Sequence, residues 1–139
     1  MDLFSRRIVG WHLKDDMTES LVLAALRLAI KERQPSEGLI HHTDRGGQYA
    51  GNDYRAVLRR AGIRQSMSRA DNCYCYDNLF KESFFGTFKT ELELTEYRDI
   101  QEALREAASY IRYYNLERKH SALEYLTPAR FEQLIHHPK

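Results

Sequence analysis

One stretch decides the fold class of this 139-residue chain: Gly38-Leu39-Ile40-His41-His42-Thr43-Asp44-Arg45-Gly46-Gly47-Gln48. Its first half predicts a short strand, and its second half predicts a polar turn with two glycines. Ligands of open α/β sheets gather at the carboxyl ends of strands, so Asp44 stands where a functional side chain is expected. An aspartate that only forms the turn is the alternative, and this stretch taken alone favours that alternative.

Strands and helices alternate on both sides of this stretch. We expect strands over 7–13 and 63–67, a helix between Thr18 and Pro35, and a helix that is capped by Asn52 and stopped by Gly62. A polar loop over 68–77 precedes an amphipathic helix over about 78–93. Further helices are expected over 100–115 and from Pro128. This order predicts an α/β layered fold in one domain, residues 1–139.

Composition excludes several classes of function. The 21 basic and 20 acidic residues leave a net charge of +1, so any nucleic-acid binding must come from local patches. No run of about 18 apolar residues suggests a membrane span, and the N-terminus does not have the pattern of a signal peptide. Cys73 and Cys75 are too close in sequence for a good disulfide, which favours a reducing, cytoplasmic setting.

The helix over about 78–93 has two distinct faces. Its core stripe is aromatic (Phe80, Phe84 and Phe88), while Asn78, Glu82 and Lys89 share a polar edge. With Asp44, Glu82 would supply the two carboxylates that a hard cation such as Mg²⁺ takes from protein. Lys89 on the same edge would then meet a phosphate backbone. A solvated helix face is the alternative for this stripe.

Four stretches together make the chain resemble a known family. They are 2–11 (DLFSRRIVGW), 41–49 (HHTDRGGQY), 72–85 with its Asn72-Cys73-Tyr74, Tyr76-Asp77-Asn78 and Glu82-Ser83-Phe84-Phe85, and 114–123 (YNLERKHSAL). In this order they resemble insertion-sequence transposases with a DDE active site and a retroviral-integrase-like core. The resemblance implies an RNase-H-like three-layer α/β fold with extra C-terminal helices. Residues of about 1–95 would be the core and about 96–139 a helical extension.

The resemblance also implies a chemistry and partners. Asp44 matches the family's second catalytic aspartate and Glu82 its glutamate, and both would hold Mg²⁺ or Mn²⁺ for phosphodiester cleavage and strand transfer. DNA, both transposon ends and target, would be the partner of a homo-oligomeric complex with no membrane contact. For the DNA contacts we expect Arg45, Asn78, Lys89, Arg118 and His120. The transposase-like stretch 114–123 argues against a nuclease of repair or RNA processing.

Two departures from the family pattern affect this expectation. The family's first catalytic aspartate lies on an opening, central strand upstream of the Asp2-Leu3-Phe4-Ser5 stretch, and this chain begins at Met1 inside that hairpin. We therefore expect the fold to lack its opening strand and the isolated chain to be inactive. Between Asp44 and Glu82 lie 37 residues (82 − 44 − 1), two more than usual, which the repeated Cys-Tyr at 73–76 explains. The alternative is an inactive remnant that only binds nucleic acid or oligomerises.

Weaker signals concern zinc, stacking and a basic cluster. His41, His42, Cys73 and Cys75 do not have the usual zinc spacing, although His42 could neighbour the metal site. Tyr110, Tyr113 and Tyr114 have helical spacing, which favours core packing over base stacking. The basic cluster of Arg112, Arg118, Lys119 and His120 would either touch DNA or only solubilise a helix end.

Overall fold

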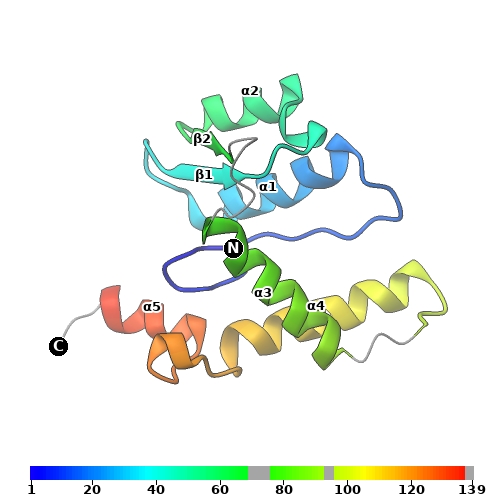
Figure 1. Ribbon diagram of the computed structural model, residues 1–139, viewed down its shortest axis with the longest axis vertical. Coiled ribbons are helices and arrows are strands. Elements are labelled where there is room, and N and C mark those ends of the chain that lie inside the picture. The colour runs from blue at the N-terminus through cyan, green and yellow to red at the C-terminus, as the bar shows by residue number, and fades with distance from the viewer. Residues whose placement is uncertain (69–75, 93–95, 137–139) are drawn as a thin grey trace. The chain divides into compact units, whose positions relative to one another are not determined.

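A computed structural model describes residues 1–68, 76–92 and 96–136 of the chain. The described residues fall into two compact units, one formed by 9–82 and the other by 1–8 together with 83–139 (Figure 1). The helix α3 passes from the first unit into the second. Helices and strands are mixed, as the sequence predicts for an α/β protein. No helix of the described residues is long and apolar enough to cross a membrane.

The sheet of the 9–82 unit has two parallel strands. The strand β1 (Ile40–Thr43) pairs with β2 (Arg64–Met67) in a register that matches Ile40 with Arg64 and Thr43 with Met67. Between them the chain passes through the 3₁₀ turn η1 (Gly47–Tyr49) and the helix α2 (Asn52–Arg60). Parallel strands need such a crossover, and it brings the carboxyl ends of β1 and β2 to the same edge. Both strands lie where the sequence predicts them.

The core of this unit lies where α1 (Glu19–Arg33) meets α2 and the start of β2. Its buried side chains are Leu23 and Leu26 from α1, Tyr54 and Leu58 from α2, and Ile63. Helical spacing of three or four residues puts each pair on one face. The predicted ends of α1 are confirmed, and Gly62, with φ of 66°, stops α2 as expected. The cap of α2 differs, because Gly51 rather than Asn52 holds the N-cap position.

The predicted strand over 7–13 is wrong, because among the described residues this segment forms no strand and belongs to no sheet. The backbone N–H and C=O of Ile8 are instead bonded to the side chain of Asn115, at 2.9 and 3.0 Å. Gly10 lies against α1, where a Cβ atom would be 2.7 Å from the Cβ of Ala29. The backbone groups of Ile8 and the glycine at position 10 therefore have partners other than a second strand, although the segment is rich in β-formers.

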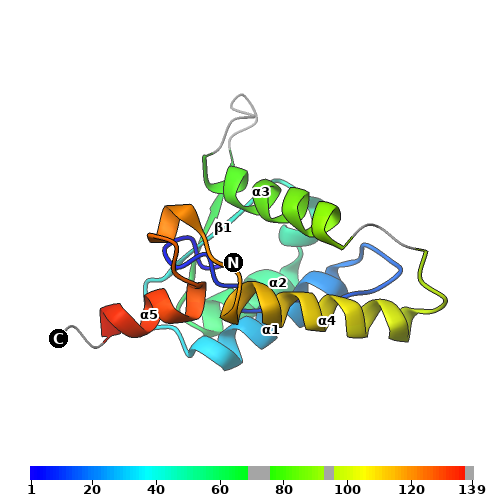
Figure 2. The same cartoon turned by 90° about the horizontal axis from the view of Figure 1, so that it is seen from below.

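The second unit is built from three helices and the N-terminal residues. The helix α3 (Tyr76–Glu91) contributes Phe84 and Phe88, whose rings lie 5.0 Å from those of Tyr114 and Tyr110 on α4 (Ile100–Leu116). Phe84, Tyr110 and Tyr114 are buried, so the predicted packing role of these aromatic stripes is confirmed, while Tyr113 is exposed. Figure 2 shows α4 continuing through η2 (Ser121–Leu123) to α5 (Pro128–His136).

A buried polar cluster ties the N-terminal residues to α5. The Ser5 hydroxyl, fully buried, donates to Glu132 Oε1 at 2.7 Å, and Arg7 Nη1 donates to Glu132 Oε2 at 2.8 Å. Glu132 is itself 9% exposed. A buried carboxylate is stable only when it is paired and hydrogen-bonded, so both contacts are needed. Ser5 and Arg7 of the N-terminal stretch thus have a structural task in this unit.

Candidate functional site

Asp44 follows β1 directly and uses its two carboxylate oxygens differently. Oδ1 accepts the backbone N–H of Gly46 at 2.9 Å and so closes the turn. Oδ2 accepts from Nζ of Lys81, on the first turns of α3, at 3.2 Å. The side chain is 45% exposed. Asp44 therefore forms its turn, as the plainer interpretation holds, and still presents one oxygen to a cationic group.

The charges around Asp44 keep it ionised. Partial burial acts to raise its pKa, but the Gly46 N–H, the Lys81 ammonium and the charge on nearby His42 together outweigh burial. The pKa of Asp44 is therefore lowered from its ordinary value, because each of these groups favours the charged form. An ionised oxygen beside a positive group is a suitable place for a metal ion to replace that group.

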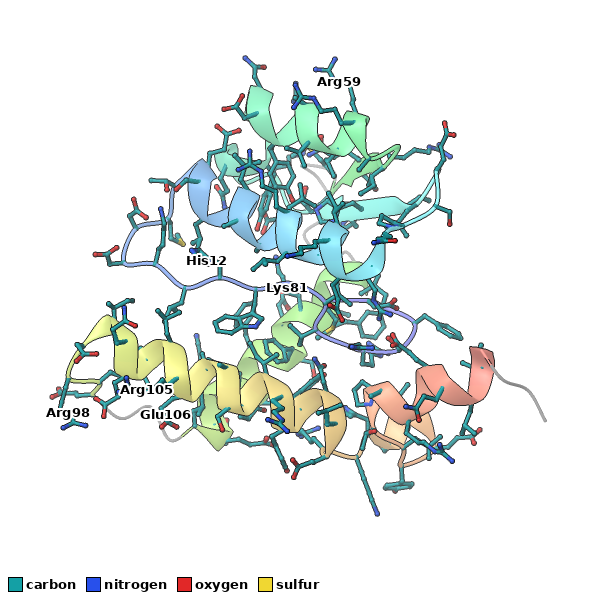
Figure 3. All side chains as sticks on the ribbon, turned by 180° about the vertical axis from the view of Figure 1, so that it is seen from behind. His12, Arg59, Lys81, Arg98, Arg105 and Glu106 are labelled. Carbon is teal, nitrogen blue, oxygen red and sulfur yellow. The ribbon has the colours of Figure 1, made fainter. Side chains whose placement is uncertain are left out.

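The ion pair between Lys81 and Asp44 also indicates where Glu82 lies relative to β1. Glu82 follows Lys81 on α3 and is exposed, so the contact between Lys81 and Asp44 brings the turn that carries Glu82 to the carboxyl end of β1. Lys81, labelled in Figure 3, is a residue of this site that the sequence did not indicate. No spacing signal could have found it, because it is separated from Asp44 by 37 positions and faces it only after folding.

The residues around Asp44 are held by hydrogen bonds to β2 and the residue after it. His42 on β1 lies with Nδ1 3.0 Å from the Ser66 hydroxyl and Nε2 3.2 Å from the Ser68 hydroxyl. Arg45 donates from Nε to the Ser68 carbonyl at 2.7 Å. The predicted neighbour His42 and the predicted phosphate ligand Arg45 thus fasten the turn of Asp44 to the carboxyl end of the sheet.

The remaining helix residues of the predicted site are less informative. Lys89 is exposed on α3, seven positions after Glu82, which is close to two helical turns and so near the same face. The Asn78 side chain lies outside the described residues, as do Cys73 and Cys75. Across 1–68, 76–92 and 96–136, no three His, Cys, Asp or Glu side chains gather in a way that could hold a metal ion.

Arg118 and His120 belong to a separate cluster in the other unit. Arg118 forms a fork of hydrogen bonds to Glu91, with Nη2 2.9 Å from Oε1, and its guanidinium lies 5.8 Å from the Tyr114 ring centre. His120 meets the same ring edge-on at 4.7 Å. Burial, followed by the charge of Arg118, lowers the pKa of His120. Glu91 was also missed from the sequence, since it lies 27 residues from Arg118.

These observations define the class of protein. It has an α/β core in which Asp44 follows the end of a strand, and a second acidic residue, Glu82, lies on the helix whose Lys81 contacts Asp44. The chain belongs to the integrase core domain family. A sequence profile of that description matches residues 1–73, and a second one with the same description matches residues 61–128. Membership implies an RNase-H-like fold, with which the observed helices and parallel strands are compatible.

Similar proteins come from bacterial insertion sequences. A transposase of IS904 from Lactococcus lactis is 42% identical over 135 residues, which is 96% of this chain and 53% of that protein. The transposase InsF of IS3A from Escherichia coli K12 is 42% identical over 134 residues, 95% of this chain and 46% of that protein. An uncharacterised 31 kDa protein of IS600 from Shigella sonnei is 41% identical over 138 residues, 97% and 50%.

The predicted resemblance to insertion-sequence transposases is therefore confirmed. The chain spans about half the length of the curated relatives it matches.

Proposed function

We propose that the chain is part of the catalytic core of an insertion-sequence transposase, in which Asp44 and Glu82 hold Mg²⁺ or Mn²⁺ for cleavage and transfer of DNA strands. One observation carries the proposal. The ion pair of Lys81 with Asp44 joins the turn bearing Glu82 to the end of β1. Membership in the integrase core domain family and similarity to named transposases support the same conclusion.

The donor set suits a hard divalent cation. Carboxylate oxygens are what Mg²⁺ and Mn²⁺ prefer, and Oδ2 of Asp44 already accepts from a positive group, the Lys81 ammonium. When bound, such an ion lowers the pKa of a water or hydroxyl and neutralises charge on the scissile phosphate. The chain's own residues do the rest. Asp44 and Glu82 would hold the ion, and the hydrogen bonds of Arg45 and His42 to Ser66 and Ser68 keep the turn of Asp44 in place.

The DNA would lie along the groups predicted for phosphate contact. Arg45 beside Asp44, and Asn78 and Lys89 on α3, are the members that we place at the reacting strand. Arg118 and His120 would contact DNA from the cluster with Tyr114, where Glu91 already offsets the Arg118 charge. The partners proposed are transposon ends and target DNA, in a homo-oligomeric complex. Two carboxylates do not complete a two-ion site, so we propose that the isolated chain does not cleave DNA.

The test is the binding of Mn²⁺ to the full 139-residue chain, measured by titration calorimetry. We expect one ion per chain, and at least tenfold weaker binding in Asp44→Asn and in Glu82→Gln. Asp53→Asn and Glu106→Gln remove exposed carboxylates elsewhere and are the matched controls, which should bind as the unaltered chain does. Equal affinity in all four variants would refute the metal site.

A further inference from the structure

A second basic surface lies on α2 and the start of β2. It consists of four exposed arginines, Arg55, Arg59, Arg60 and Arg64. Residues 52–65 contain one acidic residue, Asp53, in a chain whose overall net charge is only +1. Within the described residues none of the four guanidinium groups has a carboxylate partner. The patch is therefore a local positive field that no ion pair within the described part of the chain neutralises.

Helix stability explains only two of the four arginines. Arg59 and Arg60 lie in the last turn of α2, where positive charge complements the helix dipole. Arg55 lies in the first turn, where the dipole disfavours a cation, and Arg64 lies on β2. Helix stability alone therefore does not account for Arg55 or Arg64.

The surface is also hollowed. A cavity of about 410 Å³ is bordered by Arg55 and Arg59, with the amides of Asn52 and Gln65 on its wall and the core residues Leu58 and Ile63 below. Figure 3 shows Arg59 extending from α2 away from the ribbon. Guanidinium groups bind phosphate through paired hydrogen bonds, and amide side chains bond phosphate and sugar oxygens. The cavity thus offers the donors that a nucleic-acid backbone needs.

The surface extends away from the candidate metal site. Arg64 pairs in register with Ile40, at the N-terminal end of β1, whereas Asp44 follows the C-terminal end of that strand. A duplex on this surface would therefore contact the protein beyond the position of the reacting phosphate.

We infer that Arg55, Arg59, Arg60 and Arg64 form a binding surface for the phosphate backbone of duplex DNA, separate from the carboxylates Asp44 and Glu82. The inference rests on the proposed function in taking DNA as the partner. The inference adds a DNA contact that does not depend on base sequence, because the guanidinium groups bind phosphate and need no base edge. This surface holds the duplex by charge, and its contribution falls as salt rises.

The experiment measures affinity of the full chain for a duplex of arbitrary sequence across a salt series, in EDTA. Each phosphate contact contributes about 0.9 to the slope of log affinity against log salt. We expect Arg55→Gln/Arg59→Gln to lower that slope by about two and to weaken binding at least tenfold at low salt. Arg60→Gln/Arg64→Gln should act likewise, and Arg55→Lys/Arg59→Lys should retain most of the slope.

The matched control is Arg27→Gln/Lys31→Gln, which removes two exposed charges with the same four-residue spacing from α1 of the same unit. It should leave the slope unchanged. A loss in Arg27→Gln/Lys31→Gln equal to that in the arginine pairs, no loss in either arginine pair, or no duplex binding by the unaltered chain would each overturn the inference. Binding to phosphatidylserine vesicles is measured with the same variants. If the arginine pairs weaken vesicle binding but leave duplex binding unchanged, the surface is a lipid site and the inference is also overturned. Because no metal is present, failure of the Asp44–Glu82 site leaves this result unaffected.

Discussion

Lys81 on α3 and Asp44 after β1 form an ion pair, with Nζ 3.2 Å from Oδ2. The pair joins two residues 37 positions apart, and it places a positive charge where the proposed metal ion would bind. An exposed pair of this kind adds little to stability, since water screens it and its side chains lose freedom. Its importance lies in the position it gives to the first turns of α3.

Replacing Lys81 by Gln should strengthen Mn²⁺ binding roughly fivefold, because a charge at about 4 Å in water is worth about 1 kcal/mol and competes with the ion. Titration calorimetry measures the change. Lys31→Gln, which removes an exposed charge on α1, should bind Mn²⁺ as the unaltered chain does. Weaker binding in Lys81→Gln would mean that the ammonium supports the site instead of competing for it.

Replacing Lys89 by Ala should weaken DNA binding and lower the slope of log affinity against log salt by about one unit, as expected for one lost phosphate contact. Filter binding or fluorescence anisotropy over a salt series gives the slope. Lys31→Ala serves as the control of equal charge. If Lys89→Ala and Lys31→Ala behave alike, Lys89 belongs to a solvated helix face.

His41 should make stability depend on pH. Burial beside Tyr54, whose hydroxyl lies 2.7 Å from Nε2, lowers the pKa of His41 to about 4. The folded state thus binds this proton less readily than the unfolded state, whose pKa is about 6.5. Stability is full above pH 6.5 and falls toward pH 4, by at most about 1.4 kcal/mol per unit.

Urea unfolding at several pH values measures this dependence. His41→Gln should flatten it between pH 6.5 and 4, while His12→Gln, which removes an exposed histidine, should keep it. An unchanged pH dependence in His41→Gln would show that other groups cause it.

Gly10→Ala should destabilise the chain by about 1–3 kcal/mol, the usual cost of overpacking. A Cβ there would meet the carbonyl oxygen of Ala25 and lie 2.7 Å from the Cβ of Ala29. At Gly47 an added Cβ has no heavy atom within 4 Å, so Gly47→Ala is the control and should cost far less. Thermal unfolding followed by circular dichroism compares the two, and equal melting temperatures would contradict the close packing of Gly10 on α1.

Asn115→Leu should cost about 2 kcal/mol, because it leaves both backbone groups of Ile8 without their partner. Urea unfolding gives the change in free energy. Gln101→Leu, at an exposed position of α4, should stay within about 0.5 kcal/mol. If Asn115→Leu lowers the free energy of unfolding no more than Gln101→Leu does, water replaces the Asn115 amide at no cost.

The local sequence determined the helices and the two paired strands. Thr18 and Pro35 bracket α1, Gly62 ends α2, and Phe84 and Phe88 identify the buried face of α3, because caps, stops and periodicity act within a few residues. The turn after β1 and the place of Asp44 were readable for the same reason. The motif stretches also identified the family.

Only the tertiary structure decided which groups meet across long separations. It gave Asp44 its partner Lys81 and Arg118 its partner Glu91, and it left the segment 7–13 without a partner strand among the described residues. Asn115 bonds the backbone groups of Ile8 within one unit, and Gly10 packs against α1 within the other. The physical reason is the range of the interactions: propensity and capping are set by neighbours in sequence, whereas ion pairs, strand pairing and close packing depend on residues that only folding brings together.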